Sequence, residues 1–245
     1  MKAMLISAGY AVRMYPLTLD KPKALLKVKE KPIIEYVIKK IEDINQVDRI
    51  IIVSNNKFYN QFIKWNTENK GKFSKKIEIL NDTTNDETEK LGTVGDLIYG
   101  LEKAEVDDDI IVLNTDNLFD FSLNQAIDIF NERKKIVNGI FLENDKEKIK
   151  RHGVVKISGS RIMAFEEKPE NPESNIKSIG VYIFPREKVP KISEYKKSGK
   201  DVDKIGNLIK HFCENDEVHG CLFEGRLYDI GTIDAYNEAN RIWSE

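Results

Sequence analysis

The stretch LISAGYAVRMYPLTLDKPKALLKV, residues 5–28, decides how the N-terminal part of this chain folds. An apolar run predicts a strand, and the small residues Ala8, Gly9 and Ala11 follow it in a turn. Small side chains after a buried strand allow a ligand to approach the backbone closely. Arg13 and Lys23 come next and supply positive charge. The stretch therefore indicates a site for a negatively charged ligand.

This turn matches neither of the two common phosphate-binding motifs. It lacks G-x-G-x-x-G and G-K-[ST], and the next predicted helix begins about twenty residues later instead of opening from the glycine. Successive backbone N–H groups can still form an anion-binding concavity, to which Arg13 and Lys23 can add charge-assisted bonds suited to a polyphosphate. Solvated surface charges are the alternative, and spacing alone does not separate the two interpretations.

The hydrophobic pattern predicts an α/β fold. Strand-like runs at 3–7, 49–54, 76–80 and 109–116 alternate with helical patterns at 32–41, 95–104 and 123–130. Such alternation is typical of βαβ units and a mostly parallel sheet covered on both faces. From residue 136 the strands are closely spaced, at 136–142, 153–157, 161–167 and 180–185, with a helix at about 202–212 and another from about 232.

We therefore expect one Rossmann-like, three-layer domain over residues 1–245, with a mixed sheet and an added hairpin.

Composition and charge narrow the partners and the location expected for this protein. The net charge of −2 offers no basic field for nucleic acid or a membrane surface. We see no membrane helix or signal peptide, and the two cysteines suggest reduced thiols, so a cytoplasmic protein is expected.

Two acids follow predicted strands. Asp116 ends the run VLNTD, and Asp229 lies in RLYDIGT. Ligands of open α/β sheets bind outside the carboxyl ends of strands, so both acids could share one site with the N-terminal turn. Mg²⁺ usually takes one or two carboxylates plus substrate phosphates. A helix cap or turn residue is the alternative for each acid, with Thr232 the better cap for the last helix.

Glu167 and Lys168 lie at the end of a predicted strand, before a proline-rich turn. A carboxylate beside an ammonium group could bind sugar hydroxyls and a phosphate. A charged hairpin tip without a ligand is the alternative. The three histidines, His152, His211 and His219, show no metal-ligand spacing, and no serine triad can be recognised.

Together, five segments in this order resemble the sugar-1-phosphate nucleotidyltransferase family, of the glucose-1-phosphate thymidylyltransferase and mannose-1-phosphate guanylyltransferase type. The first, AGYAVRMYPLTLDKPKALLKV (8–28), resembles the signature A-G-x-G-T-R-x-x-P-L-T…P-K-x-L-L-x-V. The others are EKLGTVGDL (89–97), NTDNLF (114–119), the hairpin 152–184 with its E-K-P, and EGRLYDIGTIDAYNEAN (224–240). The resemblance covers nearly the whole chain.

The resemblance implies that residues 1–135 are mainly the half of the domain that binds the nucleotide. Backbone groups of Ala8 and Gly9 would hold a nucleoside triphosphate, with Gly92 near the base. Arg13 would bind the β- and γ-phosphates, and Lys23 the α-phosphate.

For the second substrate, the resemblance implies that residues 136–245 form mainly a half that binds a sugar 1-phosphate. Asp116 and Asp229 would carry Mg²⁺, Lys168 would hold the sugar phosphate, and Gly153 and Glu167 would face the sugar. The phosphate oxygen would attack the α-phosphorus, giving an NDP-sugar and pyrophosphate. A phosphate monoester is already mostly an anion at neutral pH, so no strong protein base is needed.

The chain departs from the family signature at three positions, with Ala11 in place of Gly, Val12 in place of Thr and Thr115 in place of Gly. No departure removes a charged group that the mechanism needs.

Two alternatives stay open: a cytidylyltransferase for a non-sugar phosphate acceptor, and a catalytically silent nucleotide-binding subunit. We expect no C-terminal β-helix, since no hexapeptide repeat is present. Members of this family commonly form dimers or tetramers, but no interface is recognisable, and neither the nucleobase nor the sugar can be read from these motifs.

Overall fold

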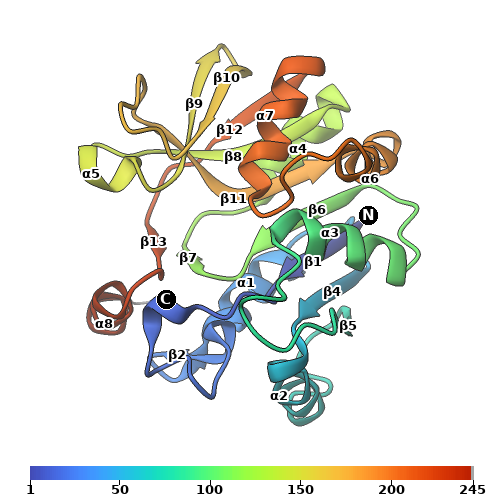
Figure 1. Cartoon of the computed structure of the whole chain (residues 1–245), viewed down its shortest axis with the longest axis vertical. Helices are drawn as coiled ribbons and strands as arrows, with labels where there is room; N and C mark the ends of the chain where they lie inside the picture. The colour runs from blue at the N-terminus through green and yellow to red at the C-terminus, as the bar shows by residue number, and fades with distance from the viewer. Residues whose placement is uncertain (244–245) are drawn as a thin grey trace.

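The computed structural model describes residues 1–243, and a nine-stranded sheet crosses the whole molecule (Figure 1). Its strands, in the order in which they neighbour one another, are β5 (Lys76–Asn81), β4 (Arg49–Ser54), β1 (Lys2–Ile6), β6 (Ile110–Asn114), β11 (Ile176–Phe184), β8 (Ile136–Leu142), β12 (Val218–Leu222), β10 (Arg161–Glu167) and β9 (Gly153–Ser158). The first four strands are parallel, and β11 runs antiparallel to both β6 and β8. β8 and β12 are parallel, and β10 is antiparallel to β12 and β9.

Helices cover both faces of this sheet. One face carries α1 (Ile33–Glu42), α2 (Asn56–Glu68) and α4 (Asn124–Arg133), and the other carries α3 (Thr93–Lys103), α6 (Val189–Lys197) and α7 (Ile205–Asn215). Alternate side chains of a strand point to opposite faces, so Ala3 and Leu5 join the first core and Met4 joins the second. The predicted three-layer α/β fold with a mixed sheet is confirmed.

A smaller core forms where the C-terminal segment of the chain packs against its N-terminal segment. The hairpin of β2 (Lys27–Val28) and β3 (Lys31–Pro32) and the ribbon of β7 (Asn117–Phe119) and β13 (Leu227–Asp229) meet α8 (Ile233–Ile242) there. Leu118, Ile230 and Trp243 are among its buried side chains. The remaining short elements are η1 (Val12–Met14), η2 (Lys23–Leu25), α5 (Lys146–Ile149) and η3 (Arg186–Lys188).

Every strand predicted above has a counterpart in the structure, but the sequence analysis missed α2 and α6. The signal for α2 was present, since Asn55 caps it by accepting a bond from Phe58 N at 3.0 Å and Phe58, Phe62 and Trp65 form its buried stripe. The helix predicted at about 202–212 begins later, at Ile205. The carbonyl oxygens of residues 202 and 203 instead accept bonds from the first N–H groups of α3.

Candidate active site

Two adjoining pockets open where β1 and β6 end. We call the first the turn pocket; it is lined in part by Ala8, Gly9, Arg13, Lys23 and Gly92. The second, the hairpin pocket, is lined in part by Gly153, Glu167, Lys168 and Asp229. Four residues line both pockets: Arg13, Thr93, Asn114 and Asp116. The two pockets therefore meet at the ends of β1 and β6, as expected for ligands at the carboxyl ends of parallel strands.

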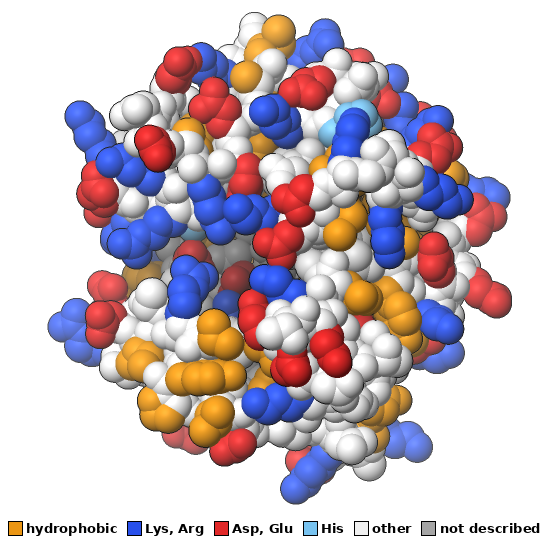
Figure 2. All heavy atoms as spheres, viewed as in Figure 1, with side chains coloured by type: hydrophobic (Ala, Val, Ile, Leu, Met, Phe, Trp, Pro, Cys, Tyr) orange, Lys and Arg blue, Asp and Glu red, His pale blue; other side chains and the backbone are white. Residues whose placement is uncertain are grey.

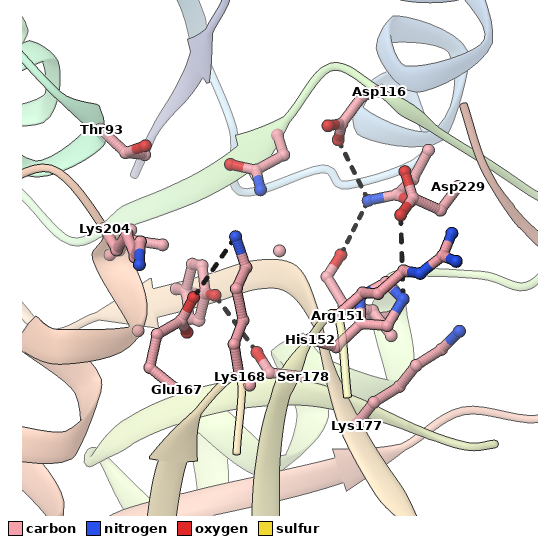
Figure 3. A pocket seen from close by; sticks show the side chains of 18 of the residues that line it. Thr93, Asp116, Arg151, His152, Glu167, Lys168, Lys177, Ser178, Lys204 and Asp229 are labelled. Atoms are coloured by element: carbon pink, nitrogen blue, oxygen red, sulfur yellow. Dashed lines mark hydrogen bonds and ion pairs between the residues drawn. The ribbon is translucent and has the colours of Figure 1, made fainter. Parts of the chain in front are cut away.

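The ribbon β7–β13 brings Asp116 and Asp229 together. Asn117, directly after Asp116, pairs with Asp229, and Ile230 N donates to Asp116 O at 2.8 Å. In Figure 3 both carboxylates lie on one side of the hairpin pocket. Backbone pairing thus fixes, side by side, two acids that lie far apart in the sequence.

Ionisable side chains surround these two acids. Lys23 Nζ lies 3.0 Å from Asp116 Oδ2. Partial burial, and then the charge of Asp116, raise the pKa of Asp229. His152 Nε2 lies 3.8 Å from Asp229 Oδ2, but burial lowers the pKa of His152 to about 4, so its ring is neutral at neutral pH. A lysine therefore lies against Asp116, and an uncharged imidazole lies near Asp229.

A carboxylate pair of this kind fits a divalent ion held partly by substrate. Among residues 1–243, no three His, Cys, Asp or Glu side chains gather as a set of metal ligands. Mg²⁺ typically keeps waters and phosphate oxygens in its shell and takes only one or two protein carboxylates. Asp116 and Asp229 could therefore hold a magnesium ion whose shell the phosphates of a ligand complete.

The N-terminal turn is bent by a residue other than glycine. Ala11 has φ 49° and ψ 42°, a left-handed conformation that is strained for alanine, and Thr18 Oγ1 donates to its carbonyl at 2.8 Å. Thr115, which replaces the family's glycine, is buried and bonds Ser7 Oγ at 2.9 Å, so its hydroxyl is used within the fold. Val12, which replaces threonine, is exposed.

Gly92 lies where the start of α3 closely contacts the segment that precedes α7. Its φ is 78°, and a Cβ there would come within 2.5 Å of Asp203 Cα. Thr93 N donates to Asp203 O at 2.9 Å and so completes the N-terminus of α3. Asp203 lines the turn pocket and its neighbour Lys204 lines the hairpin pocket, so this segment contributes to both.

The hairpin pocket holds Glu167 and Lys168 where β10 ends. Lys168 Nζ lies 3.9 Å from Glu167 Oε1, and burial raises the pKa of Glu167. A Cβ at Gly206 would overlap the Glu167 carboxylate at 1.9 Å, so this glycine makes room for it. Figure 3 shows Glu167, Lys168 and Lys204 across the pocket from Asp229.

The structure brings together all ten residues singled out from the sequence, and it adds others that sequence reasoning missed. Lining residues not predicted include Arg151, His152, Lys177, Lys204, Asp96 and Asp203. His152 and Lys177 lie within the recognised hairpin, so inspection of its charged residues could have found them. Figure 2 shows Lys and Arg side chains gathered around a hollow on the face of the molecule drawn there.

Comparison with known proteins agrees with this architecture. The chain is 29% identical over 98% of its length to the bifunctional protein GlmU of Methanocaldococcus jannaschii, covering 54% of that protein. It is 26% identical over 98% of its length to a UTP–glucose-1-phosphate uridylyltransferase of Synechocystis, covering 63% of it. The chain therefore spans about half to three-fifths of the length of these relatives.

A solved structure shows the same fold. The UTP-bound UGPase of Acinetobacter baumannii superposes with a TM-score of 0.77 at 20% identity, over 98% of this chain and 92% of that one. The profile of the family described as nucleotidyl transferase matches residues 2–245. On this match, which takes in both pockets, the chain belongs to the nucleotidyl transferase family.

Proposed function

We propose that this chain transfers a nucleotidyl group from a nucleoside triphosphate to a sugar 1-phosphate, giving an NDP-sugar and pyrophosphate. The observation that carries the proposal is the place of Asp116 where two pockets with different linings meet, with Asp229 beside it through the β7–β13 ribbon. A reaction between two phosphate-bearing substrates needs that arrangement, with the reacting phosphates at the boundary. The related uridylyltransferase, by its name, acts on UTP and glucose 1-phosphate.

In the turn pocket, Arg13 would bind the β- and γ-phosphates and Lys23 the α-phosphate. Backbone groups of Ala8 and Gly9 would hold the nucleotide, with Gly92 near its base. Lys23 already lies 3.0 Å from Asp116, so it can reach a phosphate bound at that acid. Charged donors of this kind hold phosphate oxygens strongly.

In the hairpin pocket, Lys168 would hold the phosphate of the sugar, and Gly153 and Glu167 would face the sugar ring. Apart from the ion pair with Lys168, the Glu167 carboxylate receives no hydrogen bond from the described residues. Its oxygens are therefore available for sugar hydroxyls. We also infer that residues 1–135 contribute mainly to the nucleotide and 136–245 mainly to the sugar phosphate, as parts of one domain.

The reaction is an in-line displacement. An oxygen of the acceptor phosphate forms a bond to the α-phosphorus, while the bond from this phosphorus to the bridging α–β oxygen breaks and pyrophosphate leaves. Positioning and charge neutralisation supply most of the rate in such transfers. Asp116 and Asp229 would hold Mg²⁺, which, when bound, would neutralise phosphate charge. A chain using these metabolites is expected in the cytoplasm, and no helix among residues 1–243 is long and apolar enough to span a membrane.

The test is pyrophosphate release with Mg²⁺ across a matrix of nucleoside triphosphates and phosphate acceptors, which are sugar 1-phosphates together with choline phosphate and inositol phosphate. Asp116→Asn serves as the blank, and Asp128→Asn, an exposed acid on α4, is the matched control. We expect release with a few substrate pairs, unchanged in the control and lost in the blank. Release only with choline phosphate or inositol phosphate would replace the sugar acceptor, and nucleotide binding without release from any acceptor would favour a silent binding subunit.

A further inference from the structure

Lys23 binds one of the two acids that we propose to hold a metal ion. Its ammonium nitrogen Nζ donates to Asp116 Oδ2 at 3.0 Å. The other oxygen of this carboxylate, Oδ1, accepts a longer bond of 3.3 Å from Asn117 Nδ2. Both oxygens of Asp116 are therefore engaged by the protein, and the shorter contact is with a cation.

The backbone holds Lys23 within reach of Asp116. Lys23 opens η2, in which Leu26 N donates to Lys23 O at 3.0 Å, and the next residue, Ala24, is buried in the core. The side chain of Lys23 is 19% exposed and that of Asp116 is 29% exposed, so water screens their ion pair only in part. The ammonium group can change its partner while the Cα of Lys23 stays in place.

Lys23 reaches the acids from the nucleotide side of the site. It lines the turn pocket, Asp229 lines the hairpin pocket, and Asp116 lines both. Burial and the charge of Asp116 raise the pKa of Asp229, whereas the charges of Lys23, Lys177 and Arg13 lower it. Of these three cations, Lys23 is the one that an ion pair joins to Asp116. A ligand in the turn pocket can therefore act on this ion pair directly.

An ammonium group and a divalent ion compete for the same carboxylate. Mg²⁺ binds its ligand oxygens at about 2.0–2.1 Å. If Lys23 stayed at 3.0 Å from Asp116 Oδ2, a metal ion on that oxygen would lie only a few ångström from the ammonium nitrogen. Two cations repel each other strongly at such a separation in a partly desolvated site. The lysine therefore has to leave Asp116 before the carboxylate can hold a metal ion well.

A nucleoside triphosphate offers Lys23 another partner. In the proposed function Lys23 binds the α-phosphate, and a phosphate oxygen forms a charge-assisted bond with an ammonium group as a carboxylate does. Moving from Asp116 to the phosphate frees Oδ2 of the acid. The same phosphate brings oxygens of the kind that Mg²⁺ prefers in its shell. One movement of a side chain thus removes a competing cation and adds ligands.

We propose that Lys23 controls the metal site: it binds Asp116 and opposes a divalent ion until the phosphates of a nucleoside triphosphate in the turn pocket draw the lysine away. This inference rests on the proposed function of the turn pocket as a nucleotide site. It goes beyond that function by giving Lys23 a second role. The side chain that strengthens the binding of the nucleotide weakens the binding of the metal ion alone.

The test is the binding of Mn²⁺ alone, measured by the electron paramagnetic resonance signal of the free ion. Lys23→Met should bind Mn²⁺ about tenfold or more tightly than the unaltered chain, because Asp116 has lost its cation. Lys23→Arg keeps the charge and should bind Mn²⁺ no more tightly than the unaltered chain. Lys57→Met, at an exposed lysine on α2, is the control for loss of a positive charge elsewhere. Equal or weaker binding of Mn²⁺ by Lys23→Met overturns the inference.

A double-mutant cycle assigns the effect to Asp116. In the Asp116→Asn background, the further change Lys23→Met should raise the affinity for Mn²⁺ less than about threefold, because the carboxylate for which the two cations compete is gone. A tenfold gain in this background overturns the inference, since the lysine would then act through the charge of the whole site. If Lys23→Met does not fold, Lys23→Gln, which is also neutral, should show the same gain.

The result is separable from the proposed function. Pyrophosphate release by the unaltered chain, together with unchanged Mn²⁺ binding in Lys23→Met, would leave the proposed function standing and overturn the inference. Failure of every nucleoside triphosphate to bind would overturn both. Tighter binding of Mn²⁺ and weaker binding of a nucleoside triphosphate in the same Lys23→Met protein would support the inference, because the two ligands then respond to one side chain with opposite sign.

Discussion

Two pairs of aspartates lie in one region of this molecule, and their surroundings give them opposite chemistry. Asp116 and Asp229 stand between two open pockets, with Lys23 at 3.0 Å from the first. Asp82, directly after β5, and Asp96, on α3, are almost fully buried, and burial raises the pKa of both. In the open pair, Asp116 and Asp229, the charge of Lys23 offsets part of the rise that burial causes in the pKa of Asp229, whereas in the closed pair, Asp82 and Asp96, burial raises the pKa of Asp96 to about 8. The open pair is the one that we propose to hold a metal ion.

The largest expected effect follows from neutralising one member of the open pair. Asp229→Asn keeps the shape of the side chain but removes half of the charge that would hold Mg²⁺. We expect kcat/KM to fall roughly a thousandfold, about 4 kcal/mol of transition-state stabilisation. Steady-state pyrophosphate release measures this. Activity within about threefold of the unaltered chain would contradict the role of the open pair.

The closed pair should make stability depend on pH. The pKa of Asp96 is about 8 in the folded chain against its ordinary 3.8, so between these values the folded state binds a proton that the unfolded state has lost. The free energy of unfolding must therefore fall as the pH rises through this window. From pH 5 to pH 8 we expect a loss of about 4 kcal/mol, at 1.36 kcal/mol for each pH unit.

Asp96→Asn should remove most of that loss, because the amide does not titrate. Denaturant unfolding of both proteins at pH 5 and pH 8 gives the comparison, and the difference between them isolates this pair from the other acids. If the two proteins lost the same stability, Asp96 would not hold a proton in the folded chain over this range of pH. Glu102→Gln, at an exposed acid on the same helix, should behave like the unaltered chain.

Lys23 distinguishes the open pair from the closed one. Lys23→Met removes the cation and one phosphate contact while keeping a side chain of similar length. Binding of a nucleoside triphosphate should weaken roughly thirtyfold, about 2 kcal/mol, in the range of hydrogen bonds to charged groups. Calorimetric titration measures this, and Lys57→Met, at an exposed lysine on α2, should leave binding unchanged.

The smallest effect concerns the turn that presents Arg13 to the open pair. Ala11 has φ 49°, where alanine is strained and glycine is not. Ala11→Gly should therefore raise the free energy of unfolding by about 0.5–1 kcal/mol. Ala164→Gly in β10, where φ is not positive, should lower it instead. Destabilisation by Ala11→Gly in urea unfolding would contradict the strain.

Sequence reasoning predicted most of the strands because each is a compact apolar run bounded by polar residues. It missed α6 since Val189, Ile192 and Tyr195 form only a thin apolar stripe. It placed the start of α7 too early, because no local sequence pattern shows that the carbonyl oxygens of residues 202 and 203 accept hydrogen bonds from the start of α3. That contact also carries Asp203 and Lys204 to the pockets, so these residues escaped notice.

The sequence by itself determined the α/β class, the order of the segments and the charged residues Arg13, Lys23, Asp116, Lys168 and Asp229, because periodicity and local motifs are properties of neighbouring residues. Only the tertiary structure decided which acids meet. Asp229 joins Asp116 through pairing of β13 with β7, and Asp96 lies near Asp82 because α3 packs beside the end of β5, where the Tyr99 hydroxyl donates to Asn81 O. The charge state of each pair depends on burial and on neighbours from distant segments, which no local pattern contains.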